Sequence, residues 1–404
     1  MKEILKSFLP VFVLSFYHFI LAFFGALIYG FPSKKLILIG VTGTNGKTTT
    51  TEMVASIFEK AGKKIALLNS IRFKIDKKEE INKLRMTMPG RFFIQRFLKK
   101  AVKEGCQYAI VEVTSEGIKQ HRHRFLDFKV AVFTNLAPEH IEAHGSFEKY
   151  KEAKGKFFQA TKEIHVINVE DQNSDYFLKF PSKRKITYGL KNGEINLENT
   201  KVNLNIPGEF NFYNALAAIS VAVSQGIDKD FATKVLEEFK GAPGRMEEVI
   251  SKPFKVIVDY AFTPNALEKV YQTLTQSLDH STTRSLICVL GACGGGRDKW
   301  KRPVLGELAA KYCNEVIVTN EDPYDEDPWQ IIEQVAAGTK GKARKILDRR
   351  EAIRTALKLA KEGDIVVITG KGCEPSICVA GGKKIPWDDR KVVREEFQKI
   401  YEKI

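Results

Sequence analysis

Residues 42–50 carry the side chains best suited to phosphate chemistry. They read TGTNGKTTT, so two glycines precede Lys47 and Thr48. Glycines let backbone N–H groups turn toward a phosphate, a lysine can reach its terminal oxygens, and a threonine hydroxyl can bind magnesium. The loop therefore predicts a site for ATP and Mg²⁺, with the nucleotide held by Gly43, Thr44, Asn45, Gly46, Lys47, Thr48 and Thr49.

The segments on either side of this loop support the prediction. The apolar run at residues 36–41 is typical of a buried parallel strand. An amphipathic helix is predicted from about residue 48 to residue 61, ending at Gly62. The spacing differs from the common GxxxxGK[ST] pattern because Val41 stands where its first glycine would be.

A second predicted strand, at residues 109–115 (AIVEVTS), ends near a carboxylate, Glu112. A carboxylate at the end of a parallel strand, near a phosphate loop, is a natural magnesium ligand. A strand-end glutamate taken alone is more often a solvated charge.

Composition limits the classes of protein. A chain of 404 residues predicts two or three domains. The net charge of +15 comes from lysines scattered along the chain, which disfavours specific nucleic-acid binding and suits a phosphorylated substrate or a membrane surface. The six cysteines form no CxxC pair and are expected to be reduced cytosolic thiols.

Residues 8–31 form an apolar run of 24 residues without a charge. A helix needs about 20 such residues to cross a bilayer. Lys2 and Lys6 precede the run, and Lys34 and Lys35 follow it. Three readings stay open: the segment spans a membrane, lies in its interface, or packs as a helix against the next domain. The first two would attach the catalytic part to the inner face of the plasma membrane.

The phosphate loop GVTGTNGKTTT resembles that of the Mur ligases and of the related folylpolyglutamate synthetases. The resemblance runs from about residue 26 to residue 389 and is closest to the ligases that add the third peptide residue to a UDP-muramoyl dipeptide. It implies an α/β chain with a doubly wound P-loop central domain at 34–244 and a smaller Rossmann-like C-terminal domain at 245–404, preceded by the apolar helix at 1–33. The family's N-terminal UDP-binding domain has no counterpart beyond this apolar segment.

The resemblance also implies roles for residues in the central domain. Glu112 matches the glutamate of an EVSS-like motif that binds magnesium, and positions that hold the muramoyl peptide match Ser115, Gln120 and Arg122. In residues 132–158, His140 matches a histidine near a second magnesium, and Glu139 replaces the usual aspartate. Lys154 matches a lysine that the family carbamylates. The predicted metal set is therefore Thr48, Glu112, His140 and Lys154.

Other matched positions are expected to contact ATP. Asn211 and Asn214, in GEFNFYNA, can share one helical face and touch the adenine, although Asn211 could instead cap the helix. The segment GAPGRME predicts a hinge at the domain junction, with Arg245 as an ATP contact. Asp259 is expected to accept a hydrogen bond from the ribose.

The C-terminal half carries the expected acceptor site. Residues 321–324 read EDPY where the diaminopimelate-adding enzymes carry DNPR, so the arginine for diaminopimelate's distal carboxylate is absent. Asp322 in this loop is a predicted substrate residue. In GKGCE, Cys373 replaces a histidine, and Glu374 is expected to bind the acceptor's ammonium group.

These expectations describe an ATP-dependent acid–amino-acid ligase of peptidoglycan synthesis, acting in the cytoplasm with Lys47, Lys154 and His140 as catalytic residues. The substrate carboxylate would form an acyl phosphate, and an amino acid would displace the phosphate. Two alternatives remain: a membrane-associated poly-γ-glutamate or folylpolyglutamate ligase, and a non-catalytic scaffold that keeps the nucleotide fold.

Overall fold

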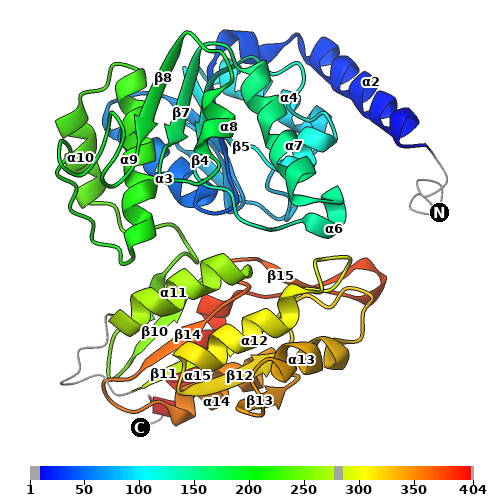
Figure 1. Cartoon of the computed structure of the whole chain (residues 1–404), viewed down its shortest axis with the longest axis vertical. Coiled ribbons are helices and arrows are strands. Elements are labelled where there is room, and N and C mark those ends of the chain that lie inside the picture. Colours follow the sequence, from blue (N-terminus) through cyan, green and yellow to red (C-terminus); the bar gives the residue numbers. More distant parts are fainter. Residues whose placement is uncertain (1–9, 277–284, 402–404) are drawn as a thin grey trace. The chain divides into compact units, whose positions relative to one another are not determined.

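The computed structural model describes residues 10–276 and 285–401, and the chain folds into two compact units (Figure 1). The first unit comprises Met1–Ala137, Ser146–Asn205 and Phe210–Phe239. The second comprises Pro138–Gly145, Ile206–Glu209 and Lys240–Ile404.

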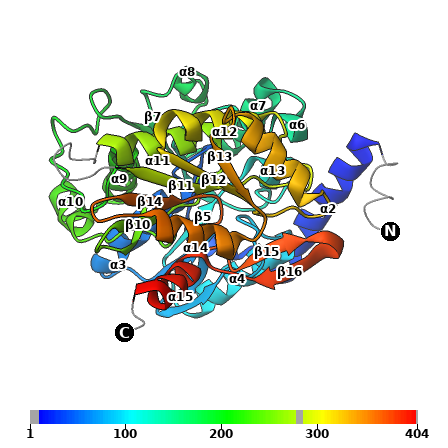
Figure 2. The same cartoon turned by 90° about the horizontal axis from the view of Figure 1, so that it is seen from below.

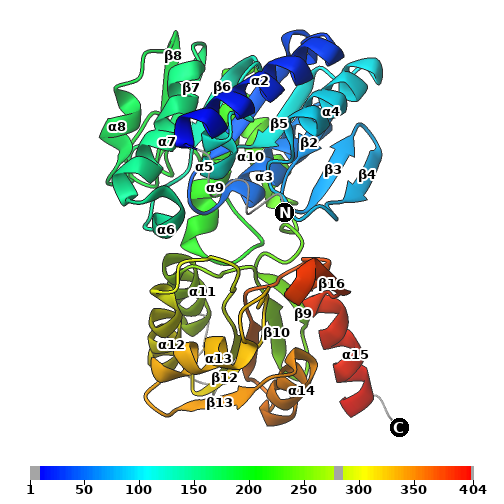
Figure 3. The same ribbon diagram turned by 90° about the vertical axis from the view of Figure 1, so that its right-hand side faces the viewer.

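The first unit is built on an eight-stranded sheet in the order β4-β3-β2-β5-β1-β6-β7-β8. Six strands are parallel, while β3 and β4 form an antiparallel edge that Figure 3 shows beside β2. The strands are β1 Ile37–Thr42, β2 Ile65–Leu68, β3 Arg72–Ile75, β4 Lys78–Ile81, β5 Tyr108–Glu112, β6 Phe128–Phe133, β7 Ile164–Asn168 and β8 Arg184–Tyr188.

Helices pack around this sheet. They are α2 Val11–Tyr29, η1 Pro32–Lys35, α3 Lys47–Lys60, α4 Arg91–Lys103, α5 Ser115–Lys119, α7 Phe147–Ala160, α8 Ser174–Leu178, α9 Glu209–Ser224 and α10 Lys229–Glu237. The predicted strand and helix around the phosphate loop are therefore present as β1 and α3. Of the predicted apolar run, residues 8 and 9 lie outside the described residues, and most of the rest forms α2.

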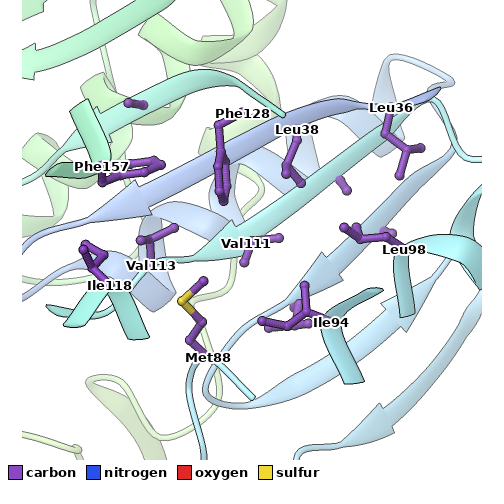
Figure 4. Packing of buried hydrophobic residues seen from close by; sticks show 14 of the residues in the cluster. Leu36, Leu38, Met88, Ile94, Leu98, Val111, Val113, Ile118, Phe128 and Phe157 are labelled. Atoms are coloured by element: carbon purple, nitrogen blue, oxygen red, sulfur yellow. The ribbon is translucent and has the colours of Figure 1, made fainter. Parts of the chain in front are cut away.

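The core of the first unit explains one glycine in the central strand. Leu38, Val111, Phe128 and Phe157 pack together on one side of the sheet (Figure 4). A Cβ atom at Gly40 would collide with the Phe128 and Phe157 rings, so β1 can pass beneath them only because this position has no side chain.

The second unit contains a six-stranded sheet in the order β13-β12-β11-β14-β10-β9, in which only β9 is antiparallel. Its strands are β9 Glu247–Ile250, β10 Lys255–Val258, β11 Leu286–Leu290, β12 Glu315–Thr319, β13 Ala343–Ile346 and β14 Ile365–Ile368. Strand β10 ends one residue before Asp259, and β14 leads into the GKGCE segment.

Helices α11 Pro264–Gln276, α12 Lys301–Tyr312 and α13 Pro328–Ala337 lie on one face of this sheet, and α14 Arg349–Leu359 and α15 Asp389–Tyr401 lie on the other (Figure 2). A short helix, α6 Ile141–His144, also belongs to this unit, as do the hairpin β15 Ser376–Val379 and β16 Lys383–Pro386 and the turn η2 Ala380–Gly382. Both units thus have the α/β layering that the sequence predicts.

Candidate functional site

The phosphate loop leaves the carboxyl end of β1 and requires glycine at two positions. Gly43 has φ of 152° and Gly46 has φ of 82°, values that side chains strongly disfavour. A Cβ atom at Gly43 would collide with the Thr134 hydroxyl, and one at Gly46 would collide with the Asn214 amide. The loop backbone is therefore held against its neighbours more closely than any side chain would permit.

The residues after β6 fix the conformation of this loop. The backbone carbonyl of Asn135 accepts a hydrogen bond from the Thr44 N–H at 2.9 Å. The side-chain oxygen of Asn135 accepts one from the Asn45 N–H at 3.0 Å. The Thr134 hydroxyl donates to the Asn45 carbonyl at 2.7 Å. Tyr150, on α7, lies 3.1 Å from the Thr44 hydroxyl. Thr134, Asn135 and Tyr150 were not among the predicted site residues.

Two lysines converge on the loop from different helices. Lys47, at the start of α3, donates to the carbonyls of Gly43 at 3.0 Å and Thr44 at 2.8 Å. Lys154, on α7, donates to the same Gly43 carbonyl at 2.9 Å and is 1% exposed. Burial, and secondarily the charge of Lys47, lowers the pKa of Lys154 well below its ordinary value. The neutral form of this amine is therefore favoured more strongly than in an exposed lysine.

Thr48 and Glu112 meet through a shared neighbour, Ser70. The Thr48 hydroxyl donates to the Ser70 hydroxyl at 3.4 Å. Ser70 in turn donates its backbone N–H and its hydroxyl to the two oxygens of the Glu112 carboxylate, each at 3.0 Å. Ser70 follows the carboxyl end of β2, so the strand-end reasoning that singled out Glu112 could also have identified it.

This donor set fits magnesium bound together with a nucleotide. Within residues 10–276 and 285–401, no three His, Cys, Asp or Glu side chains lie close enough to bind a metal ion by themselves. Magnesium, however, usually binds one or two protein oxygens and takes its remaining ligands from water and phosphate. A hydroxyl from Thr48 and a buried carboxylate from Glu112 meet that requirement. The Lys154 amine could join them only after conversion to an anion.

His140 lies in the second unit, on the segment Pro138–Gly145, at the N-cap of α6. The Asp298 carboxylate accepts hydrogen bonds from the two backbone N–H groups after His140, those of Ile141 at 3.3 Å and Glu142 at 3.0 Å. The preceding residue, Glu139, forms a buried ion pair with Lys301 at 2.9 Å. Lys47, Thr48, Glu112 and Lys154 are thus grouped in one unit, whereas the role of His140 beside magnesium stays a prediction.

Asn211 and Asn214 share one face of α9, as expected from their spacing. The Asn214 amide donates to the Asn211 side-chain oxygen at 3.2 Å and accepts from the Thr50 hydroxyl at 3.3 Å. Asn211 is the third residue of α9, which is inside the helix and not at its N-cap. Asn214 therefore supports the phosphate loop directly, and contact of this pair with adenine stays a prediction.

The three predicted muramoyl-peptide residues lie on and just after α5. Ser115 is the buried first residue of this helix, and the Thr114 hydroxyl caps it by accepting from the Gly117 N–H at 3.0 Å. Arg122 donates to the Gln120 side-chain oxygen at 2.7 Å and also to the Met88 carbonyl. Burial lowers the pKa of Arg122 from its ordinary value. Gln120 and Arg122 are thus brought together.

Arg245 and Asp259 are neighbours in the second unit. The Arg245 guanidinium lies 4.1 Å from the centre of the Tyr260 ring. Asp259 accepts from the backbone N–H groups of Met246 at 2.7 Å and Ala261 at 2.6 Å. Burial raises the pKa of Asp259, and the charge of Arg245 opposes that rise. Contact of either residue with the nucleotide stays a prediction.

The predicted acceptor residues Asp322 and Glu374 are linked by a lysine that the sequence analysis did not identify. The fully buried Lys371 amine donates to Asp322 at 2.9 Å and to Glu374 at 2.6 Å. The hydroxyl of Tyr260 donates to the other Glu374 oxygen at 3.0 Å. Glu374 is the more exposed of the two carboxylates, which suits it to meet an incoming ammonium group.

A further cation belongs to this neighbourhood. Arg297, from the loop after β11, hydrogen-bonds Tyr324. Burial acts to lower the pKa of Arg297, but its interactions with Cys293, Tyr260 and Tyr324 raise it overall. The predicted acceptor region thus contains a guanidinium group as well as a carboxylate, a pair that can bind the two charged ends of an amino acid.

Comparison with known proteins matches both units. Residues 41–222 match the Mur ligase middle domain, and residues 244–372 match the Mur ligase glutamate ligase domain. A UDP-N-acetylmuramoyl-L-alanyl-D-glutamate–2,6-diaminopimelate ligase of Syntrophomonas wolfei is 38% identical over 403 residues, covering 93% of this chain and 81% of the relative. The enzyme of the same name from Alkaliphilus metalliredigens is 38% identical over 402 residues, which cover 93% of this chain and 80% of that enzyme.

Solved structures show the same fold. A UDP-N-acetylmuramoyl-L-alanyl-D-glutamate–2,6-diaminopimelate ligase has a TM-score of 0.60 and 31% identity, covering 90% of this chain and 78% of that one. A folylpolyglutamate synthase of Mycobacterium tuberculosis has a TM-score of 0.69 and 19% identity, and the match covers 86% of this chain and 91% of that one. The second likeness concerns the fold alone.

Proposed function

This chain belongs to the Mur ligase family of ATP-dependent enzymes that add amino acids to muramoyl peptides, and we propose how its residues carry out that reaction. The observation that supports the proposal most strongly is the gathering of Lys47, Thr48, Glu112 and Lys154 around one phosphate loop. This arrangement provides a cation for the γ-phosphate and oxygen ligands for magnesium.

In the first step, the carboxylate of the muramoyl peptide attacks the γ-phosphorus of ATP, the bond to ADP breaks, and an acyl phosphate forms. Lys47 moves from the Gly43 and Thr44 carbonyls to the γ-phosphate oxygens. Thr48 and Glu112 would hold magnesium, which would neutralise charge on the phosphates. Little other chemistry is required of the protein, because phosphoryl transfer depends on positioning and charge.

Lys154 acts as a carbamate in this proposal. Its neutral amine adds to carbon dioxide, a proton leaves, and the amine becomes an anion beside Lys47. The support is the lowered pKa of Lys154 and its contact with the same Gly43 carbonyl as Lys47. A carbamate anion at this position would pair with the Lys47 ammonium and could hold magnesium. A protonated Lys154 amine would instead repel both the Lys47 ammonium and magnesium.

In the second step, the amino group of the incoming amino acid attacks the acyl carbon, and phosphate leaves. Glu374 binds the ammonium group of this amino acid before it loses a proton, and Gln120 and Arg122 hold the muramoyl peptide. The support is the partly exposed carboxylate of Glu374 and the joined polar groups of Gln120 and Arg122. We place the domain boundary at residues 244 and 245, where the second matched region begins.

The alternative, a poly-γ-glutamate or folylpolyglutamate ligase, has weaker support. The folylpolyglutamate synthase shares the fold at 19% identity, whereas a relative at 38% identity, matched over 93% of this chain, is a muramoyl-peptide ligase. We place the reaction in the cytoplasm, where ATP is available, with attachment to the inner face of the plasma membrane through α2.

An ATP-dependent phosphate-release assay with paired substrates tests this function. One arm supplies UDP-muramoyl-dipeptide with either lysine or diaminopimelate, and the other supplies pteroate or oligoglutamate with glutamate. We expect phosphate release that requires the muramoyl dipeptide and an amino acid. Release only in the glutamate arm would contradict the cell-wall reaction.

A further inference from the structure

Helix α2 has two chemically different faces. The face on the first unit carries small or polar residues: Ala22 and Ala26 are buried, and the Ser15 hydroxyl lies 2.8 Å from the His121 ring nitrogen. At its edge, the rings of Phe19 and Phe23 pack on that of Phe125. The opposite face exposes large apolar side chains, with Phe12 74% and Phe16 66% exposed, followed by Tyr17, Phe24, Leu27 and Ile28.

A band of cations lies on α4, the helix that contacts α2, and on the segment that follows α2. Helix α4, which contacts α2 and lies beside it in Figure 3, has no acidic residue and exposes Arg96, Lys99, Lys100 and Lys103. The Lys99 amine lies 5.8 Å from the ring of Tyr29, at the end of α2. Lys34 and Lys35 follow α2 and are also exposed.

We propose that the outward face of α2 rests on an anionic lipid bilayer, with the helix axis parallel to the membrane plane. Its phenylalanine, leucine and isoleucine side chains then enter the boundary between headgroups and acyl chains, while Lys34, Lys99 and Lys103 contact lipid phosphates. Large apolar residues beside a basic band are the chemistry of an interfacial helix. Exposure to water of so many neighbouring aromatic rings is otherwise unfavourable.

The contacts of α2 argue against a helix that crosses the membrane. Residues Phe12–Tyr29 are long and apolar enough to span, and only 17% of them are buried in the protein. A helix that crossed the membrane, however, would lose the contact of Ser15 with His121 and the packing of Phe19 and Phe23 on Phe125. If it kept these contacts, it would draw the cations of α4 into hydrocarbon. Lying in the interface keeps every one of these contacts.

The cations also favour lipid over a second copy of the chain. A two-fold contact through α2 would set the same face of two copies together. The basic band of one copy would then meet the basic band of the other, and like charges disfavour such a contact. Phosphate groups of lipid headgroups supply the complementary charge instead.

The first test measures binding of the full chain to vesicles of phosphatidylcholine alone and of phosphatidylcholine mixed with phosphatidylglycerol. We expect binding to the anionic vesicles. The double variant Lys99→Glu/Lys103→Glu should weaken it by roughly thirtyfold or more, because each basic residue near the surface contributes substantially. Phe16→Ser/Phe24→Ser should weaken it by at least about tenfold. The matched control Lys179→Glu/Lys191→Glu makes the same charge change on exposed residues outside α2 and α4 and should bind within about twofold of the parent.

The second test distinguishes lying from spanning. Nitroxide labels on Phe16→Cys and Ile28→Cys are separated by about 18 Å along the helix axis. An in-plane helix gives both labels the same shallow depth in the bilayer, and the labelled parent chain supplies the background of the native cysteines. If the depths of the two labels, measured from the same bilayer surface, differ by most of about 18 Å, the proposal is overturned in favour of a spanning helix.

Three other results would also overturn the proposal. They are absence of binding to anionic vesicles, equal binding by the α4 variant and the control, and self-association without lipid that Phe16→Ser/Phe24→Ser abolishes. Thermal melting of every variant identifies loss of folding. Phosphate release is recorded separately, so failure of this proposal and failure of the ligase reaction are distinguishable.

Discussion

Lys47 and Lys154 donate hydrogen bonds to the same acceptor, the carbonyl oxygen of Gly43, at 3.0 and 2.9 Å. One lysine begins the helix after the phosphate loop, and the other comes from α7. Two ammonium groups at one carbonyl repel each other, and Lys154 is the more buried of the two. The loop therefore favours one charged and one neutral amine.

Replacement of Lys154 by methionine should abolish ligation but stabilise the fold. Lys154→Met removes a buried amine and keeps a flexible side chain of similar length, so in bicarbonate-free buffer at neutral pH we expect the free energy of unfolding to rise by roughly 1 kcal/mol or more. Thermal or denaturant melting measures this change. Lower stability than the parent at neutral pH would contradict an amine that is costly to bury.

The stability difference between the parent and Lys154→Met should also depend on pH. Because folding lowers the pKa of Lys154, the unfolded chain binds more protons than the folded chain between that lowered pKa and the ordinary lysine value of 10.5. Stability of the parent due to this group therefore rises with pH toward 10.5. We expect the advantage of Lys154→Met to shrink as pH increases, and an advantage that grows would refute the assignment.

Loss of Lys47 should remove phosphoryl transfer. Lys47→Ala deletes the cation that meets the γ-phosphate, and we expect phosphate release to fall by roughly a hundred- to a thousandfold. Lys60→Ala, at the other end of α3, is the matched control, since its exposed pair with Glu238 contributes about 0–1 kcal/mol. Full activity of Lys47→Ala would eliminate the role of the phosphate loop.

Neutralising Glu112 should weaken the use of magnesium. Glu112→Gln keeps an oxygen that can accept from Ser70 but removes the negative charge. The Mg²⁺ concentration for half-maximal phosphate release should rise by about tenfold or more. Glu79→Gln, on exposed β4, is the control for a lost carboxylate. An unchanged magnesium dependence of Glu112→Gln would show that this carboxylate does not hold the metal.

The acceptor loop should be convertible toward diaminopimelate. Tyr324→Arg restores the arginine of the DNPR pattern, whose forked donors pair with a carboxylate. We expect the ratio of kcat/KM for diaminopimelate over lysine to rise by about tenfold or more. Tyr324→Phe, which loses the contact with Arg297 without adding charge, should not raise it. Equal ratios for Tyr324→Arg and the parent would show that this position does not select the amine.

Sequence patterns predicted the elements of the site better than its contacts. The strand, loop and helix around Lys47 were predictable because burial and glycine chemistry act on adjacent residues. Lys371 was not, because it acts through a partner 49 residues away and does not stand out locally. Ser70 follows the carboxyl end of β2, so its position was predictable, but its bond to Glu112, 42 residues away, was not. The uniform apolar run likewise predicted a helix long enough to cross a bilayer. It did not predict that Ala22 and Ala26 would face the protein while Phe16 and Ile28 face outward.

Transfer of isotope from the substrate carboxylate to phosphate tests the central claim most directly. The muramoyl dipeptide is labelled with ¹⁸O in the carboxylate to be joined, and phosphate released in the presence of ATP, Mg²⁺ and the amino acid is analysed by mass spectrometry. An acyl phosphate intermediate predicts that each phosphate carries one labelled oxygen, because the carboxylate oxygen leaves with phosphorus when the amine attacks carbon. Phosphate released without the label would contradict the ligase mechanism.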